Sequence, residues 1–309
     1  MEIKETVLNE VKKAVVGKDD VLDMAFTAIL ARGHILIEDI PGVGKTTMAV
    51  AFSKALGLEY HRVQFTPDVL PSDIVGFSML DKETGEMIYK PGSIFCNLFL
   101  ADELNRATSR TQSALLEAME EGRVTVDGKT HSVPDPFIVM ATQNPVGSSG
   151  TQLLPESQLD RFMVRLSLGY PDAENELELL QRKQGGNSMD KIVRAASRED
   201  LAALRAEVDS VYVDRKIFDY VIRLSNASRG NSNVIHGASP RASIAVVCMA
   251  KAHAWMNGRD YVVPSDIKAV FPATITHRLL LTAEAKASGM TARNVVDKLL
   301  SSTPAPAAV

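Results

Sequence analysis

The sequence PGVGKT at residues 41–46 decides the fold that we expect for this chain. It follows the apolar run ILI at residues 35–37, which predicts a strand buried on both faces, and it opens a helix that runs from Lys45 towards Gly57. Its glycines allow the backbone to curl so that N–H groups point at phosphate oxygens, and the helix N-terminus adds partial positive charge. The stretch therefore predicts a Walker A loop, which binds nucleotide phosphates between a strand and a helix.

The loop also supplies a cation and a hydroxyl. We expect Lys45 to reach the β- and γ-phosphates of ATP and the Thr46 hydroxyl to ligate Mg2+. The strict motif has a glycine at position 39, where this chain has Asp39, but the later glycines still allow the close approach to phosphate. The residues of the loop predicted to bind nucleotide are Pro41, Gly42, Val43, Gly44, Lys45, Thr46 and Thr47.

An acidic motif follows a second apolar strand. Residues Leu98–Ala101 predict a buried strand, and Asp102 and Glu103 come directly after it. Because parallel strands end at one edge of a sheet, these carboxylates should lie beside the loop. We expect Asp102 to hold Mg2+ through water, and we expect Glu103 to orient and polarise the water that attacks ATP.

Strands and helices alternate through the first half of the chain, which favours a parallel sheet with helices on both faces. Two segments interrupt the alternation, Gly76–Ser93 and Arg123–Val133, and Asp127-Gly128 within the second is a strong turn signal. We expect both segments to form β-hairpins that project from the core. The five predicted strands are Ile35–Ile37, Tyr60–Phe65, Leu98–Ala101, Phe137–Thr142 and Met163–Leu168.

The second half of the chain has a helical pattern. After Tyr170-Pro171-Asp172 the sequence becomes helical, and from about Lys191 onwards only helical periods are found. Gln184–Ser188 contains two glycines and is the best candidate for a linker. We therefore predict an α/β nucleotide-binding core at residues 1–184 and a smaller all-α lid domain at residues 191–309.

Composition narrows the class of protein. The 309 residues carry a formal net charge of −4, so the chain has no overall basic footprint for nucleic acid. No apolar run approaches the roughly 18 residues needed to span a membrane, and the N-terminus lacks the features of a signal peptide, so we expect a cytoplasmic protein. Cys96 and Cys248 form no C-x-x-C pair and the six histidines have no metal-ligand spacing, so zinc and redox chemistry are not expected.

Longer motifs carry a family resemblance. They are IEDIPGVGKT at 37–46, ADELNRA at 101–107, TQSALLEAMEE at 111–121, ATQNP at 141–145 and LLPE at 153–156. Together they resemble MoxR-type AAA+ ATPases, in order, over about residues 15–242. In that family the position of Asp39 often holds an acidic residue or glycine, so this departure from the strict motif is compatible with the resemblance.

The resemblance implies roles for side chains outside the loop. Asn144 would be the sensor 1 residue, which helps to position the attacking water, and Arg161 would be the arginine finger that acts on the ATP of a neighbouring subunit. Arg241 would be the sensor 2 residue on the lid, and Val16-Gly17 would lie against adenine. Because a finger supplied in trans requires an oligomer, the resemblance implies a homo-oligomeric ring, which we expect to be a hexamer.

Ordinary structural roles remain open for two of these residues. Asn144 could cap a strand, and Arg161 could pair with a nearby carboxylate, Asp160 or Glu156. Arg106 and Arg123 are further candidates for contacts across a subunit interface.

The resemblance implies that ATP hydrolysis drives remodelling or maturation of protein partners, with a von Willebrand A domain protein as the expected client or adaptor. A motor on nucleic acid and a magnesium chelatase-type motor subunit are alternatives. The second hairpin carries only Arg123, Lys129 and His131 as basic side chains, which is too few to favour nucleic acid, so no nucleic acid partner is expected. A nucleotide switch without turnover is disfavoured, because a water-orienting glutamate and an arginine finger are both predicted.

Overall fold

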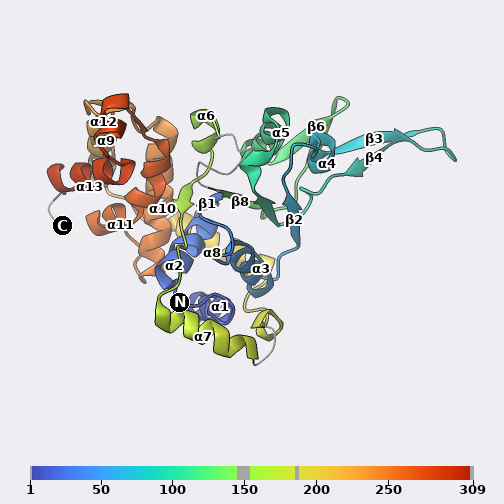
Figure 1. The fold of residues 1–309 in the computed structure, drawn as a ribbon, viewed down its shortest axis with the longest axis horizontal. Helices are drawn as coiled ribbons and strands as arrows, with labels where there is room; N and C mark the ends of the chain where they lie inside the picture. Colours follow the sequence, from blue (N-terminus) through green and yellow to red (C-terminus); the bar gives the residue numbers. More distant parts are fainter. Residues whose placement is uncertain (1, 145–153, 185–187, 307–309) are drawn as a thin grey trace.

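The structure is a computed structural model, and it describes residues 2–144, 154–184 and 188–306. An α/β core and a helical bundle formed by the C-terminal residues lie side by side (Figure 1). A long β-hairpin projects from the end of the core that is farthest from the bundle (Figure 1). The predicted fold class, an α/β core followed by a smaller helical domain, is confirmed.

A five-stranded parallel sheet forms the centre of the core. Its strand order is β2-β5-β8-β1-β9, and each neighbouring pair is parallel. The two strands β5 and β8 are buried along their whole length, which agrees with the apolar runs LFLA and IVMA at their starts. The strands are β1 (Ile35–Glu38), β2 (Tyr60–Gln64), β5 (Leu98–Asp102), β8 (Ile138–Gln143) and β9 (Val164–Leu166).

Alternate side chains of the sheet enter two separate hydrophobic cores. Ile35 and Ile37 of β1 enter one core, together with Phe26 and Phe52 from helices, while Leu36 enters the other. The first core continues into the C-terminal bundle. A strand that is buried on both faces lacks polar alternation, and for this reason its short apolar run predicted it correctly.

Helices cover both faces of the sheet. The first core includes residues of α1, α2 and α3, and the second includes residues of α4 and α5. The helices of this part of the chain are α1 (Glu2–Lys12), α2 (Asp19–Leu30), α3 (Lys45–Ala55), α4 (Pro71–Val75), α5 (Ser109–Glu121), α6 (Glu156–Leu159) and α7 (Ala173–Gln184).

Both predicted hairpins are present. The first pairs β3 (Gly76–Leu80) with β4 (Met87–Pro91), and the second pairs β6 (Arg123–Val126) with β7 (Lys129–Ser132). In the second hairpin Asp127 and Gly128 have φ values of +49° and +75°, as a two-residue turn of type I′ requires.

The C-terminal residues form the helical bundle and one short pair of strands. The helices are α8 (Arg198–Ser210), α9 (Arg215–Arg229), α10 (Pro240–Met256), α11 (Pro264–Ile275), α12 (Ala283–Ala287) and α13 (Ala292–Ser302). The expectation of helix alone was wrong here, because β10 (Val234–His236) pairs antiparallel with β11 (Leu280–Leu281). These strands have three and two residues, too few to show alternation, and tertiary contacts between distant segments bring them together.

The division into residues 1–184 and 191–309 stays a prediction, and the central residues of the proposed linker, 185–187, lie outside the described residues. The helices that the structure describes include none long and apolar enough to cross a membrane. The cytoplasmic location also stays a prediction.

Candidate active site

The loop between β1 and α3 has the backbone that its glycines predict. Gly42 and Gly44 have φ values of +88° and +98°, in the left-handed region that favours glycine. Gly44 directly precedes Lys45, the first residue of α3, so its turn leads the chain into the helix. Apart from the adjoining residues of the chain, no described atom lies within 4 Å of the position that a Cβ would take at either glycine. Backbone conformation, and not lack of space, therefore requires glycine at these positions.

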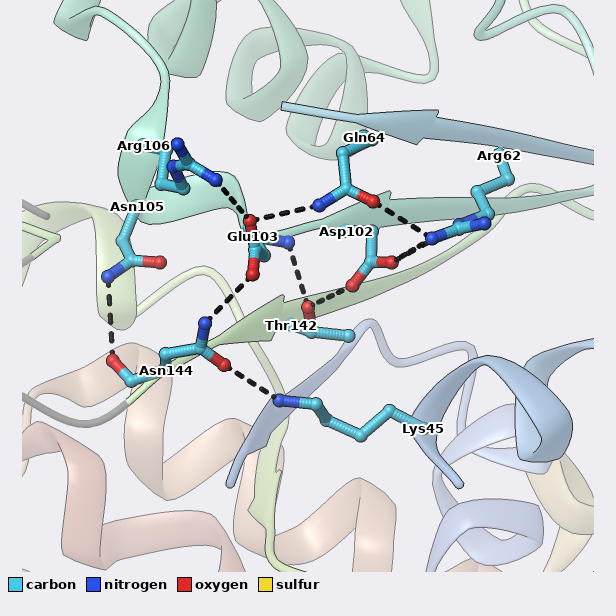
Figure 2. Close-up of polar contacts among 9 residues, drawn as sticks. All are labelled: Lys45, Arg62, Gln64, Asp102, Glu103, Asn105, Arg106, Thr142 and Asn144. Carbon is cyan, nitrogen blue, oxygen red and sulfur yellow. Dashed lines mark hydrogen bonds and ion pairs between the residues drawn. The ribbon is translucent and has the colours of Figure 1, made fainter. Parts of the chain in front are cut away.

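Lys45 is held inside the site although it carries a charge. Only 8% of the residue is exposed, and its Nζ donates to the Asp39 carbonyl oxygen at 2.6 Å. The same Nζ donates to Asn144 Oδ1 at 3.1 Å (Figure 2). Burial lowers the pKa of Lys45, while the charges of Asp102, Asp39 and Glu103 oppose this shift. The ammonium group is thus bonded to two oxygen acceptors, which phosphate oxygens can replace.

Asp39 occupies the position where the strict motif has glycine, and it ties the loop to the sheet. Its Oδ1 accepts from the Ile40 N–H at 2.9 Å, and its Oδ2 accepts from the Ser167 hydroxyl at 3.0 Å and the Gly169 N–H at 2.7 Å. Ser167 and Gly169 follow β9, the neighbour of β1. The carboxylate therefore fixes the start of the loop, which a glycine cannot do.

Glu103 projects from a strained backbone at the end of β5. Its φ of 56° is left-handed, a conformation that costs a non-glycine residue on the order of 1–3 kcal/mol. Its N–H donates to the Thr142 hydroxyl at 2.8 Å. Its carboxylate accepts from Arg106 at 2.8 Å, Asn144 at 2.9 Å and Gln64 at 2.9 Å (Figure 2). The hydrogen bond from Arg106 is the main cause that lowers the pKa of Glu103, so this carboxylate is ionised at neutral pH.

Asn144 connects the two motifs. It lies directly after β8 and is 8% exposed. Its Oδ1 accepts from Lys45, and its Nδ2 donates to Glu103, so one amide joins the loop lysine to the acidic motif (Figure 2). The structure therefore places Asn144 where a sensor 1 residue would act, although this role itself stays a prediction.

Asp102 lies beside Glu103 and is also 8% exposed. Its Oδ1 accepts from the Thr142 hydroxyl at 2.6 Å, and its Oδ2 accepts from Arg62 Nη2 at 2.6 Å (Figure 2). Asp102 and Thr46 line one cavity, and their carboxylate and hydroxyl oxygens are the donors that Mg2+ prefers. Among the described residues no group of three or more His, Cys, Asp or Glu could hold a metal ion. The donor set fits an ion held largely by nucleotide phosphates and water.

Two cavities meet at the loop. The first, of about 390 Å³, is lined by polar side chains that include Lys45 and Glu103. The second, of about 470 Å³, shares residues of the loop with the first and is lined in part by Val16, Val43 and Tyr170. Gly17 forms the turn after Val16, with φ of +67°, and a Cβ there would collide with Asn175. The predicted nucleotide-binding residues that line the first cavity are Pro41, Gly42, Gly44, Lys45, Thr46, Thr47 and Asp102.

Arg161 and Arg241 lie together but outside the Lys45 cavity as its described lining defines it. Arg161 Nε is 3.2 Å from Glu120 Oε2, although the geometry of this ion pair does not make a hydrogen bond. Arg241 donates to the other oxygen of Glu120. The ordinary partners considered for Arg161 bind elsewhere, because Asp160 pairs with Arg278 at 2.8 Å and Glu156 pairs with His236 at 3.0 Å.

Two side chains of the site, Arg62 and Gln64, were not predicted from the sequence. Both lie on β2, two residues apart, so they project from the same face of the strand, and Gln64 is in register with Asp102. Two polar residues on one face of a predicted strand were the available signal. Arg106 bonds to Glu103 of its own chain, and Arg123 pairs with Glu121 at 3.1 Å. A contact of either arginine across a subunit interface stays a prediction.

Two family models match the chain. The model of the "ATPase family associated with various cellular activities (AAA)" matches residues 34–164, and the model of the "AAA lid domain" matches residues 226–299. The first match contains the loop and the acidic motif, and the second lies within the C-terminal bundle.

Several known proteins are similar over nearly the whole chain. "Uncharacterized protein YeaC" of Bacillus subtilis is 45% identical over 97% of this chain and 93% of its own length. "Chaperone MoxR1" of Mycobacterium tuberculosis is 38% identical over 98% of this chain and 82% of its own length. A crystal structure described as a "putative ATPase" from Cytophaga hutchinsonii has a TM-score of 0.91 and 39% identity, and the match covers 99% of this chain and 95% of that one.

Proposed function

Because this chain belongs to the MoxR family of AAA+ ATPases, as its motifs predicted, we propose that it hydrolyses ATP in the presence of Mg2+ to remodel or mature protein partners. The observation that carries the proposal is the linked set Lys45, Asn144 and Glu103, in which one buried amide joins the phosphate-binding lysine to an ionised glutamate (Figure 2). A site that only bound nucleotide would not need this connection.

Each side chain of the set has a distinct task in hydrolysis. Lys45 and the loop N–H groups bind the β- and γ-phosphates, and Glu103 orients and polarises the attacking water. Asn144 fixes both side chains relative to each other. Thr46 and, through water, Asp102 would hold Mg2+, which when bound offsets negative charge on the phosphates.

The adenine ring has a separate place in the proposal. The second cavity adjoins the loop, and Val16 and Val43 give it an apolar lining. We assign adenine to this cavity, with Gly17 holding the turn that shapes it.

Assembly completes the site in this proposal. Arg161 and Arg241 share Glu120 and are not among the described side chains that line their own Lys45 cavity. Phosphoryl transfer spreads negative charge over the equatorial oxygens, which guanidinium groups match well. We therefore assign both arginines to the nucleotide of a neighbouring subunit in a hexameric ring that ATP tightens.

The surface of the first hairpin favours a protein partner. Phe77, Met79, Leu80 and Met87 are large apolar side chains exposed on β3 and β4. Apolar groups of this size suit contact with protein rather than with the phosphate backbone of nucleic acid. One relative is named a chaperone, which agrees with work on a protein client. We keep a von Willebrand A domain protein as the expected client or adaptor.

The test uses ATP hydrolysis first and capture of a partner second. The wild-type protein should hydrolyse ATP only with Mg2+ present. A Glu103→Gln ring loaded with ATP should then retain a client from extract that Lys45→Ala protein, which cannot bind nucleotide, does not retain. Absence of Mg2+-dependent hydrolysis at micromolar protein would contradict the proposal.

A further inference from the structure

Three separate segments of the chain meet at the carboxylate of Glu120. Glu120 lies in the last turn of α5, Arg161 follows α6, and Arg241 is the second residue of α10. Glu120 Oε2 lies 3.2 Å from Arg161 Nε, and Glu120 Oε1 accepts a hydrogen bond from Arg241 Nη2. Since α5 is part of the core and α10 part of the bundle, one carboxylate joins the two.

Helix electrostatics oppose the positions of both Glu120 and Arg241. Glu120 lies near the C-terminus of a helix, where the partial charge is already negative. Arg241 lies at the N-terminus of another helix, where the partial charge is already positive. The two unfavourable placements offset each other only when the side chains meet. Side chains whose charge is unfavourable at their position in a helix are typical of functional sites.

The backbone on both sides of Arg161 is held firmly by the bundle. Arg278, whose side chain is 3% exposed, donates to Asp160 at 2.8 Å and to the Phe162 carbonyl oxygen at 2.9 Å. His277 Nε2 donates to the same carbonyl at 3.0 Å. Asp160 and Phe162 are the neighbours of Arg161 in sequence, so its position depends on the bundle that also carries Arg241.

The other side of the contact is fixed by the core. His34 Nδ1 accepts from the Val139 N–H at 3.0 Å, so its Nε2 carries the proton and donates to the Met119 carbonyl oxygen at 3.0 Å. Met119 directly precedes Glu120, so this buried histidine anchors the end of α5 to the sheet. Rigid elements therefore support all three side chains.

The side chains themselves stay accessible. Exposed fractions are 30% for Arg161, 36% for Glu120 and 44% for Arg241. The contact with Arg161 engages Nε, so it does not require the two terminal nitrogens of the guanidinium. A fixed backbone with partly exposed cationic side chains is the arrangement needed to meet an anion on another molecule.

We propose that Glu120 is a positioning residue that holds Arg161 and Arg241 side by side, as one two-arginine unit, for the nucleotide phosphates of the neighbouring subunit. Two guanidinium groups bound to one carboxylate repel each other. The carboxylate offsets that repulsion and still leaves the group with a net positive charge. The inference rests on the proposed function, because it assumes that hydrolysis uses arginines supplied in trans.

The first test is Glu120→Gln, with Glu117→Gln as its matched control. Glu117 is an exposed carboxylate one turn earlier on α5, so the control removes the same charge from the same helix. Because 1 Å of misplacement can cost about 10²-fold in rate, we expect Glu120→Gln to lower ATP turnover by on the order of 10- to 100-fold. Nucleotide binding should stay at the wild-type level in both variants. ATP turnover should stay at the wild-type level in Glu117→Gln.

Rings mixed from two variants show which side of the subunit interface the Glu120→Gln change damages. Glu120→Gln subunits keep an intact Glu103, and Glu103→Gln subunits keep an intact arginine unit, so a mixture contains interfaces with both parts intact. This mixture should recover activity, whereas a mixture of Glu120→Gln with Arg161→Ala should not, because both changes damage the same side of the interface. A residue that only stabilised the fold would not give this pattern.

The outcomes separate this inference from the proposed function. The mixture of Arg161→Ala with Glu103→Gln tests trans action alone; if it fails, the proposed function fails first. If that mixture recovers activity but Glu120→Gln with Glu103→Gln does not, the role of Glu120 is wrong. ATP turnover at or above the wild-type rate in Glu120→Gln also contradicts the positioning role of Glu120. Should Glu120→Gln not fold, Glu120→Asp keeps the charge but shortens the reach, and the same loss and the same complementation pattern are expected.

Discussion

Two polar clusters of this molecule differ in burial and in the origin of their parts. The cluster around Lys45, Asn144 and Asp102 is almost closed, with 8% of each residue exposed, and all its members come from the loop and the strand ends of the core. The cluster of Arg161, Glu120 and Arg241 has side chains that are 30–44% exposed, and Arg241 comes from the bundle.

The difference indicates two kinds of task. A buried cluster with its hydrogen bonds made inside one chain is suited to hold a small ligand in fixed geometry. A half-exposed group of cations that rigid backbone supports is suited to meet a second molecule. One chain thus carries both halves of a site that, in our proposal, only assembly brings together.

The largest effect should come from Glu103, which Asn144 links to the buried cluster. Glu103→Gln should lower ATP turnover by on the order of 10²–10⁴-fold, because the carboxylate that orients water is lost, while nucleotide binding remains. Lys45→Ala should lose nucleotide binding itself. Steady-state hydrolysis and titration with a fluorescent ATP analogue measure the two effects. Turnover at the wild-type rate in Glu103→Gln would show that the catalytic assignment is wrong.

A loss of similar kind should follow from the exposed cluster, but mixing should repair it. Arg161→Ala should lower turnover by on the order of 10²-fold or more. Mixed with Glu103→Gln subunits, it should recover part of the activity, since some interfaces then pair an intact Glu103 with an intact Arg161. A protein that stays monomeric with a non-hydrolysable ATP analogue, and gains nothing from mixing, would rule out trans action.

The contribution of His34, which holds the end of α5 below the exposed cluster, to the free energy of unfolding should depend on pH. Burial lowers the pKa of His34 from 6.5 to about 4, so the unfolded chain binds this proton before the folded chain does. The stability that neutral His34 contributes is complete above the unfolded pKa and is lost as the pH falls towards the folded pKa. The loss should amount to about 3 kcal/mol.

The matched variant for this prediction is His34→Gln. Glutamine can accept from Val139 and donate to Met119 without titrating, so its free energy of unfolding should fall less between pH 7 and pH 4.5 than that of the wild type. Urea unfolding at several pH values measures both. Equal pH dependence in the two proteins would mean that His34 does not protonate on unfolding in this range.

The last prediction is that DNA has no effect on ATP hydrolysis. Single- or double-stranded DNA should not change the ATPase rate at physiological salt, because the chain has a net charge of −4 and its second hairpin has few basic side chains. A several-fold stimulation of hydrolysis would favour a motor on nucleic acid over remodelling of protein.

Much of the fold could be predicted because its signals are local. The Walker A loop needs glycines at fixed offsets, and buried strands appear as short apolar runs, so the strands and both hairpins were found where expected. The β10–β11 pair was missed, because its strands are too short to show alternation and about 45 residues separate them. Pairing between such distant segments depends on how the bundle packs.

The sequence by itself determined where the glycine-rich loop and the acidic motif lie, because both follow from residue type and spacing. Only the tertiary structure decided their surroundings. The sheet order β2-β5-β8-β1-β9 brings Arg62 and Gln64 onto the acidic motif and gives Asp39 its partners beyond β9. Packing of the bundle on the core likewise brings Arg241 to Glu120, although 121 positions separate the two residues in the chain. Contacts between such distant positions leave no periodicity in sequence, since they arise from the burial of separate apolar faces against one another.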